Sequence, residues 1–372
     1  MLPECRILDD PYRIPKFDLE HRDIEGFVEE LKGFHEEFRD CFNRQEPRVN
    51  FYQYMIGQLS QLERKSIEPI ALNVENAKVR AMQFFVSDVI WDDKKILSKY
   101  RSMVNNDMGD PAGALIFDET GFIKKGDESA GVAKQYCGTI GKVENCQVGV
   151  FVGYASRHGY CLLGSRLFIP EKWFTDEYAE RRKKCKFPQD LEFKTKPQLA
   201  VQLLQEISQQ AMIPFRYAVA DSIYGNSPEF IQAVERIRGV TYFVSMPNDT
   251  LCWLKNPVIL QKQYRYKGKL RTKQVLRTPE QGPIEFKTLA KNINKYFWYR
   301  RKVSEGTKGP IEYEFTKRRV ILSKNGLPNS EVWLLIRRTR DAKPSYSYFI
   351  SNAPLEQPTK TFRLAKRHPM GY

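Results

Sequence analysis

Two short apolar runs that each end in an aspartate constrain the fold of this sequence most strongly. The first run, Ala114–Phe117, is followed by Asp118, and the second, Phe215–Ala220, is followed by Asp221. Apolar runs of this length, bounded by turn-forming residues, are typical of buried strands. An ionised carboxylate directly after a buried strand is costly unless it accepts hydrogen bonds or binds a cation. The pattern therefore predicts an α/β sheet with a buried acid at the end of each of these strands.

The segments between and beyond the two acids alternate between strand-like and helical patterns. Further strands are expected at residues 147–155 and 160–169, joined as a hairpin, and at residues 241–246. Amphipathic helices are expected at residues 196–212 and 228–237. This succession of strands and helices indicates an α/β fold.

The sequence on either side of this core has a different character. Residues 1–110 carry apolar side chains at three- and four-residue steps, which predicts several short helices. These helices could bind DNA, or their apolar stripes could be ordinary packing surfaces. Residues 250–331 lose the helical period and show short β-prone runs between Gly-Pro and Asn-Gly turns, which predicts a β-rich insertion. The core is then expected to comprise residues 111–249 and 332–372.

Positive charge is concentrated in the predicted insertion. The formal net charge is +15, and the segment Lys262–Arg319 holds seventeen lysine and arginine residues against five acids. Aromatic residues such as Tyr264 and Tyr266 are interleaved with these cations, which suits phosphate neutralisation and base stacking. The alternative is a solvated basic face of a sheet. The candidate DNA-binding residues are Lys262, Arg265, Lys267, Lys269, Arg271, Lys273, Arg300, Arg301, Lys302 and Lys308.

Several classes of protein are disfavoured. No apolar stretch approaches the roughly 18 residues of a membrane span, and the first twenty residues lack the apolar region of a secretory signal. The seven cysteines are widely spaced with no Cys-x-x-Cys pair, which indicates reduced thiols rather than a disulfide framework or a zinc site. We therefore expect a cytoplasmic protein with no membrane partner.

Asp118 and Asp221 could share divalent metal ions if their strands are neighbours in the sheet. Ligands that offer only oxygen select Mg²⁺ or Mn²⁺ over zinc. Two such ions, about 3.5–4 Å apart, can activate a nucleophile and stabilise the leaving oxygen of a phosphodiester. The alternative is that the two aspartates are turn formers or helix caps at strand ends.

Longer motifs around both acids resemble a known family. The runs Phe117–Gly126 and Gly141–Val150 are similar to the insertion-sequence transposases of the DDE superfamily. The run Ala218–Gly225 resembles the second-acid motif of that family. Two further segments, Glu305–Pro310 and Val332–Ile336, are similar to its insertion domain. The likeness extends from about residue 40 to residue 355.

This resemblance implies a ribonuclease-H-like mixed sheet with flanking helices, a helical DNA-binding N-terminal region and the β-rich insertion already described. It implies that Asp118 and Asp221 are the first and second catalytic metal ligands, with Mg²⁺ or Mn²⁺ as cofactor. The implied activity is metal-dependent cleavage and strand transfer at transposon ends. The implied partners are transposon-end and target DNA, bound by a homo-oligomer in the nucleoid of a prokaryote.

The third acid of the family is a glutamate within an Arg-x3-Glu-x6-Lys pattern on a helix after the last strand. Ser351–Pro354 resembles the lead-in to that helix, but Glu356 follows at once and has no arginine four residues earlier. The sequence therefore predicts that the third acid and its C-terminal helix are missing, as in a truncated copy, and we assign it to no residue. One alternative function is a non-catalytic DNA-binding remnant that acts as a repressor or inhibitory subunit. Another is a nuclease that uses two acids.

Overall fold

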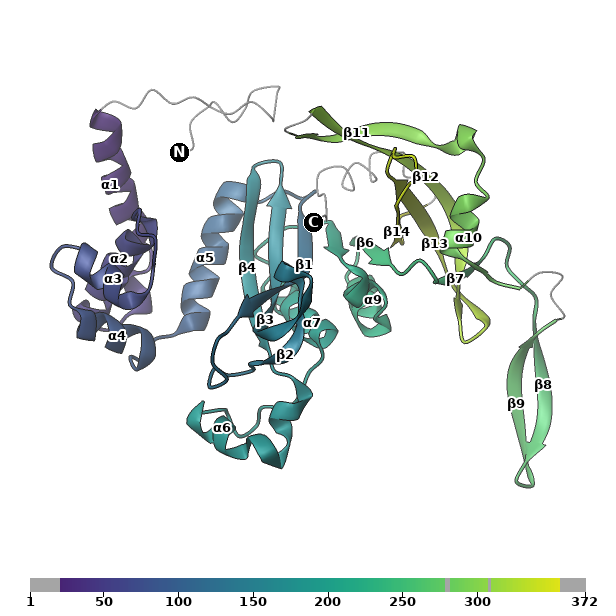
Figure 1. Ribbon diagram of the computed structural model, residues 1–372, viewed down its shortest axis with the longest axis horizontal. Helices are drawn as coiled ribbons and strands as arrows, with labels where there is room; N and C mark the ends of the chain where they lie inside the picture. Colours follow the sequence, from purple (N-terminus) through teal and green to yellow (C-terminus); the bar gives the residue numbers. More distant parts are fainter. Residues whose placement is uncertain (1–20, 278–281, 307–308, 355–372) are drawn as a thin grey trace. The chain divides into compact units, whose positions relative to one another are not determined.

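Figure 1 shows a computed structural model of the chain, which describes residues 21–277, 282–306 and 309–354. The chain divides into two compact units, Met1–Val104 and Asn105–Tyr372. The three-part division expected from the sequence stays a prediction. Among the described residues, no helix combines the length and the apolar character needed to cross a lipid bilayer.

The described part of the first unit, from residue 21 onward, is helical. Its elements are α1 (His21–Glu36), η2 (Arg39–Cys41), α2 (Gln45–Leu59), α3 (Ile67–Asn73), α4 (Val79–Ser87) and α5 (Asp93–Met108), the last of which continues into the second unit. Their apolar residues pack into two clusters, one around Phe38, Phe42 and Phe85 and the other around Ile70 and Met82. The three- and four-residue apolar spacing of this region therefore serves helix packing.

The second unit is built on a large mixed sheet. Its first strands are β1 (Ala114–Ile123), β2 (Ala133–Cys137), β3 (Lys142–Ser156), β4 (Gly159–Phe168), β5 (Tyr217–Ala220) and β6 (Thr241–Met246). Strand β1 pairs antiparallel with β3 and parallel with β5, and β5 pairs parallel with β6. Strands β2 and β4 both pair antiparallel with β3. Antiparallel strands that lead into a parallel pair form the ribonuclease-H-like sheet that the resemblance implied, and the predicted fold class is confirmed.

Three helices follow the strands of this core: α7 (Lys196–Gln210), α8 (Ser222–Gly225) and α9 (Pro228–Glu235). Helix α7 contacts β3 and β4, and α8 and α9 both contact β6. Thr195 and Gln198 form a reciprocal capping box that fixes the start of α7. The predicted helices at 196–212 and 228–237 are therefore present, and each ends two residues earlier than expected. Helix α7 ends because Ala211 adopts a left-handed conformation.

The predicted β-rich segment continues the same sheet. The strands that extend it are β7 (Leu251–Trp253), β10 (Ile284–Glu285), β11 (Tyr299–Gly306), β12 (Gly309–Lys324), β13 (Leu327–Arg338) and β14 (Tyr346–Ser351). Hydrogen bonds run from β10 through β7, β12, β13 and β14 to β6, which gives a twelve-stranded sheet. Strands β8 (Ile259–Tyr266) and β9 (Lys269–Leu276) form a separate two-stranded sheet.

The β-rich segment at residues 250–331 also contains one short helix, α10 (Phe286–Lys291), which the sequence pattern did not indicate. This helix is only six residues long, too short for a sequence period to be recognised, and it buries Phe286, Leu289 and Ala290 on one face. The remaining short elements are η3 (Gly138–Ile140), η4 (Glu171–Phe174), η5 (Asp176–Tyr178), α6 (Ala179–Lys184) and η6 (Lys295–Phe297).

Candidate metal centre

The register of two parallel strands brings the predicted aspartates together. Phe117 of β1 and Ala220 of β5 form the last pair between these strands. Asp118 and Asp221 are the residues that directly follow this pair, so they lie next to each other in space although 103 residues separate them in sequence. Beyond this point β1 continues against β3, whereas the chain after Asp221 turns into α8.

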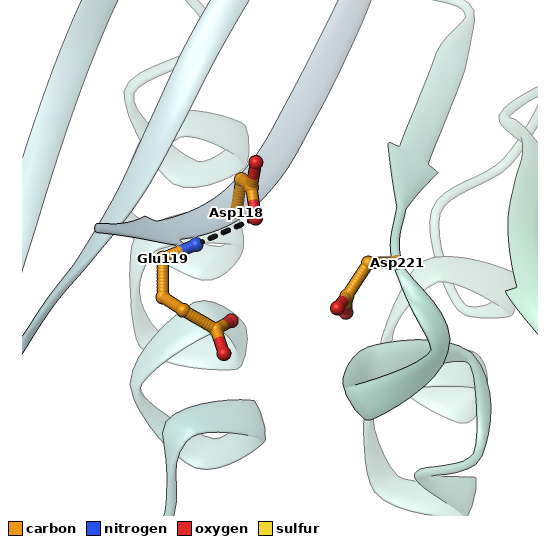
Figure 2. Close-up of side chains that lie close together, drawn as sticks. All are labelled: Asp118, Glu119 and Asp221. Atoms are coloured by element: carbon orange, nitrogen blue, oxygen red, sulfur yellow. Dashed lines mark hydrogen bonds between the residues drawn. The ribbon is translucent and has the colours of Figure 1, made fainter. Parts of the chain in front are cut away.

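Glu119 joins the two aspartates. Asp118, Glu119 and Asp221 each offer a carboxylate oxygen, and these oxygens lie within 4.8 Å of one another (Figure 2). Successive strand residues point to opposite faces of a sheet, so Asp118 and Glu119 leave β1 on different sides. Figure 2 shows the Glu119 and Asp221 carboxylates turned toward each other. Although they start from different sides of β1, the carboxylates of Asp118 and Glu119 both lie close to that of Asp221. The three acids are next to the part of β1 that β5 no longer covers.

Local hydrogen bonds fix both aspartates. Oδ1 of Asp118 accepts a hydrogen bond of 2.8 Å from the backbone N–H of Glu119. Oδ1 of Asp221 accepts one of 2.9 Å from the backbone N–H of Ile223, which makes Asp221 the N-cap of α8. The helix-cap interpretation of Asp221 is therefore correct. It does not exclude a second role, because an ionised carboxylate has about four acceptor sites and one cap bond uses only one.

The electrostatics of the three acids favour a cation. Burial raises the pKa of Asp221 to about 6, and the nearby charges of Glu119 and Asp118 contribute to this shift. The expectation of two buried acids is wrong, because Asp118 is exposed and Asp221 is only half-buried. Strand β5 ends before these positions and leaves β1 uncovered at Asp118. The carboxyl group of Asp118 is still partly desolvated, which raises its pKa. Like charges held this close repel one another until a proton or a metal ion neutralises them.

Glu119 and its two partners were not identified from the sequence. The Lys196 ammonium Nζ lies 3.0 Å from Oε1 of Glu119, and the Tyr224 hydroxyl donates a hydrogen bond of 3.0 Å to Oε2. The side chains of Lys196 and Glu119 are only 18% and 15% exposed. The signals available were the Asp-Glu dipeptide at 118–119 and the tyrosine three residues after Asp221. No local pattern links Lys196 to either of them.

The donor set suits a hard divalent cation. All three side chains offer carboxylate oxygen, and neither histidine nor cysteine belongs to the group. Oxygen-only ligand sets are typical of Mg²⁺ and Mn²⁺ sites, whereas zinc sites favour nitrogen and sulfur. The residues present therefore fit the metal ion that the sequence led us to expect.

Six of the predicted DNA-binding residues lie on the hairpin of β8 and β9, and all six are exposed: Lys262, Arg265, Lys267, Lys269, Arg271 and Lys273. Cross-strand pairing places Lys262 beside Lys273 and Tyr264 beside Arg271. The Lys273 ammonium lies 5.4 Å from the centre of the Tyr264 ring. One face of this hairpin is thus an exposed surface of cations and tyrosines.

The other four predicted DNA-binding residues lie outside this hairpin. Arg300, Arg301 and Lys302 are exposed on β11. Arg300 forms an ion pair with Glu312, which also accepts a hydrogen bond of 2.6 Å from Arg340. The charge of Arg300 is therefore partly neutralised within the protein. Lys308 lies outside the described residues.

A pocket of about 380 Å³ adds further cations that the sequence analysis did not single out. Its lining includes Lys317, Arg318 and Arg319 together with the aromatic residues Phe297 and Tyr299. None of the three clustered acids lines it. Like the β8–β9 hairpin, this pocket combines positively charged side chains with aromatic rings. Strands β11 and β12 therefore also contribute basic and aromatic residues to the surface.

Comparison with known proteins defines the family of this chain. Residues 37–310 match the family model described as "DDE superfamily endonuclease". This match covers most of the sequence, so the chain belongs to the DDE superfamily endonuclease family. The resemblance noted in the sequence is thereby confirmed.

Two individual proteins are similar to this chain. It is 23% identical over 296 residues to the "Probable transposase for insertion sequence element IS701" of Microchaete diplosiphon, covering 79% of this chain and 68% of that protein. Among solved structures, it is similar to the piggyBac transposase in a synaptic complex with hairpin DNA, with a TM-score of 0.34 and 10% identity. That similarity covers 88% of this chain and 55% of the piggyBac chain, so this chain spans about half of that transposase.

Proposed function

We propose that this chain is a DNA transposase of an insertion sequence, which cleaves phosphodiester bonds at transposon ends and transfers the freed strand to target DNA. The observation that carries the proposal is the convergence of Asp118 and Asp221 at the point where the parallel pairing of β1 with β5 ends. Membership of a family of DDE endonucleases supports it.

In this proposal Asp118 and Asp221 hold the catalytic metal. A bound Mg²⁺ or Mn²⁺ ion would supply Lewis-acid stabilisation of the charge that develops on the phosphodiester. Hydrolysis at the transposon end breaks a P–O bond and leaves a 3′-hydroxyl group. That hydroxyl then attacks a phosphorus atom of target DNA, forms a new P–O bond and displaces one target strand end. Both reactions require the DNA to be held at the edge of β1, where Asp118 is exposed.

The DNA would be held by the basic surfaces. We assign phosphate contacts to the exposed cations of the β8–β9 hairpin and to Arg301 and Lys302 of β11. The tyrosines of the hairpin offer aromatic faces on which bases or cations can stack. We also assign DNA binding to the helical region of residues 1–110. Action on two transposon ends would require a homo-oligomer, and the expected location is the nucleoid of a prokaryotic cell.

The direct test is end cleavage by the full chain with labelled transposon-end DNA in Mg²⁺ or Mn²⁺. We expect cleavage that depends on the metal and is abolished by Asp118→Asn and by Asp221→Asn. The control is Glu206→Gln, which alters a half-buried carboxylate paired with Arg166 and leaves the three clustered acids unchanged. Cleavage that survives both aspartate substitutions would contradict the proposed site.

The same assay distinguishes an active transposase from the alternative function, a non-catalytic DNA-binding remnant. The basic hairpin is a separate two-stranded sheet, and its cations are distinct from the three clustered acids. A protein that binds transposon ends tightly through this hairpin but never cleaves them would act as a repressor or an inhibitory subunit. In that case the aspartate substitutions would leave end binding unchanged.

A further inference from the structure

The proposed metal site contains one carboxylate whose role the two aspartates do not explain. Glu119 is mostly buried, and both of its oxygens are hydrogen-bonded to side chains from distant parts of the chain. Lys196 is 77 residues away in sequence and Tyr224 is 105 residues away. Such a carboxylate has little rotational freedom, because turning it would break a hydrogen bond at each oxygen.

Each of the two partners is itself fixed. Lys196 is the first residue of α7, directly after the capping residue Thr195, and its ammonium group also lies 5.7 Å from the centre of the Phe168 ring. Tyr224 is fully buried in α8, and its ring packs against Phe230 with centroids 5.6 Å apart. The two donors therefore approach Glu119 from two different helices of the core, one at each oxygen.

These hydrogen bonds leave Glu119 able to bind a cation. A carboxylate oxygen has two lone pairs, so one donor at each oxygen leaves one acceptor site on each. One of these oxygens lies within 4.8 Å of an oxygen of Asp118 and one of Asp221. Lys196 also offsets part of the mutual repulsion of three carboxylates before a metal ion arrives.

We propose that Lys196 and Tyr224 are positioning residues that hold Glu119 as an additional carboxylate of the metal site, beside Asp118 and Asp221. This inference rests on the proposed function, because it takes the site formed by Asp118 and Asp221 as given. Two carboxylates leave most positions of a Mg²⁺ or Mn²⁺ ion to water, and a third restricts where the ion can lie.

The test is the affinity of the full chain for Mn²⁺, measured by isothermal titration calorimetry without DNA. Tyr224→Phe is the most informative variant, because it removes one hydrogen bond to Glu119 and leaves every charge unchanged. We expect it to weaken Mn²⁺ binding by about tenfold, the usual effect of removing a group that orients a metal ligand. Glu119→Gln should weaken binding at least as much. Lys196 is less suitable for this test, because its positive charge by itself opposes a cation.

Two control variants separate positioning from a general loss of stability. Tyr242→Phe alters another core tyrosine that is 1% exposed, and Glu206→Gln alters a carboxylate paired with Arg166. Both should keep the Mn²⁺ affinity of the unaltered chain, and melting curves should show that every variant is folded. If Tyr224→Phe lowers the melting temperature but leaves Mn²⁺ affinity unchanged, Tyr224 is only structural and the inference is wrong.

Failure of this inference is distinguishable from failure of the proposed function. If Asp118→Asn abolishes Mn²⁺ binding while Glu119→Gln and Tyr224→Phe bind like the unaltered chain, the two aspartates suffice and Glu119 is an ordinary ion-pair partner. If the unaltered chain does not bind Mn²⁺, or Asp118→Asn binds it equally well, the proposed metal site itself is wrong. Weakened binding in both Glu119→Gln and Tyr224→Phe, with both controls unchanged, supports the assignment.

Discussion

Gly225 lies directly against Ser245: a β-carbon at Gly225 would be 2.2 Å from the backbone carbonyl oxygen of Ser245. Helix α8 therefore packs with its backbone on strand β6, at a distance that only glycine permits. The same short helix begins at the cap Asp221 and contains Tyr224, so the close approach to β6 sets the position of both side chains.

Gly225→Ala should consequently disturb the site as well as the core. The added methyl group has to push α8 away from β6, and overpacking of this kind costs about 1–3 kcal/mol. We expect a lower melting temperature together with weaker Mn²⁺ binding, measured by calorimetry on the same preparations. Gly33→Ala is the control, because no atom lies within 4 Å of the position of its β-carbon. Unchanged Mn²⁺ affinity in a destabilised Gly225→Ala protein would show that the position of α8 does not matter to the metal.

Neutralisation of the basic hairpin should weaken binding to every DNA sequence alike. Replacing Lys267, Lys269, Arg271 and Lys273 with glutamine removes four exposed cations from β8–β9 and its turn. On duplex DNA, the slope of log affinity against log salt concentration should flatten by about 0.9 for each phosphate that the variant no longer neutralises.

A matched control for the hairpin replaces four exposed cations elsewhere in the second unit with glutamine. These residues are Arg236, Arg238, Lys287 and Lys291. The net charge changes equally in both variants, so only the hairpin variant should alter the salt slope. Equal slopes in the two variants and the unaltered chain would mean that the hairpin is a solvated surface and that DNA binds elsewhere.

The sequence predicted the strands that carry Asp118 and Asp221, because short apolar runs that end in an acid are a local pattern. It did not reveal the ion pair between Lys196 and Glu119, since that pair depends on how the start of α7 packs against the sheet and has no local signature. The continuity of the sheet from β6 through β14 to β12 was also not predicted. Pairing between strands far apart in sequence depends on neighbours that a local period cannot specify.

Tyr154→Phe should destabilise the second unit. The hydroxyl group of this fully buried residue accepts a hydrogen bond of 2.9 Å from the backbone N–H of Asp110 and donates one of 2.9 Å to the carbonyl oxygen of Pro214. Removing it leaves both backbone groups without this partner, which costs about 1–3 kcal/mol for each buried group left unsatisfied. Urea denaturation should show the loss. Tyr160→Phe, at a side chain that is 86% exposed, should change stability by less than about 0.5 kcal/mol. Equal midpoints for the two variants would contradict the anchoring role of Tyr154.

The raised pKa of Asp221 predicts how metal-free stability depends on pH. Burial and the charges of Glu119 and Asp118 raise this pKa to about 6, above the ordinary value of 3.8. The folded protein therefore holds this proton more tightly than the unfolded chain does. The resulting stabilisation is complete below the ordinary pKa and is lost as the pH rises through about 6.

Asp221→Asn mimics the protonated form and should remove this contribution, so the unaltered chain should lose stability relative to the variant between pH 4 and pH 7. Melting temperatures in EDTA across that range provide the measurement. Mn²⁺ competes with the same proton, so its affinity for the unaltered chain should fall as the pH drops below about 6. A constant difference between the two proteins at all pH values would show that Asp221 does not titrate in this range.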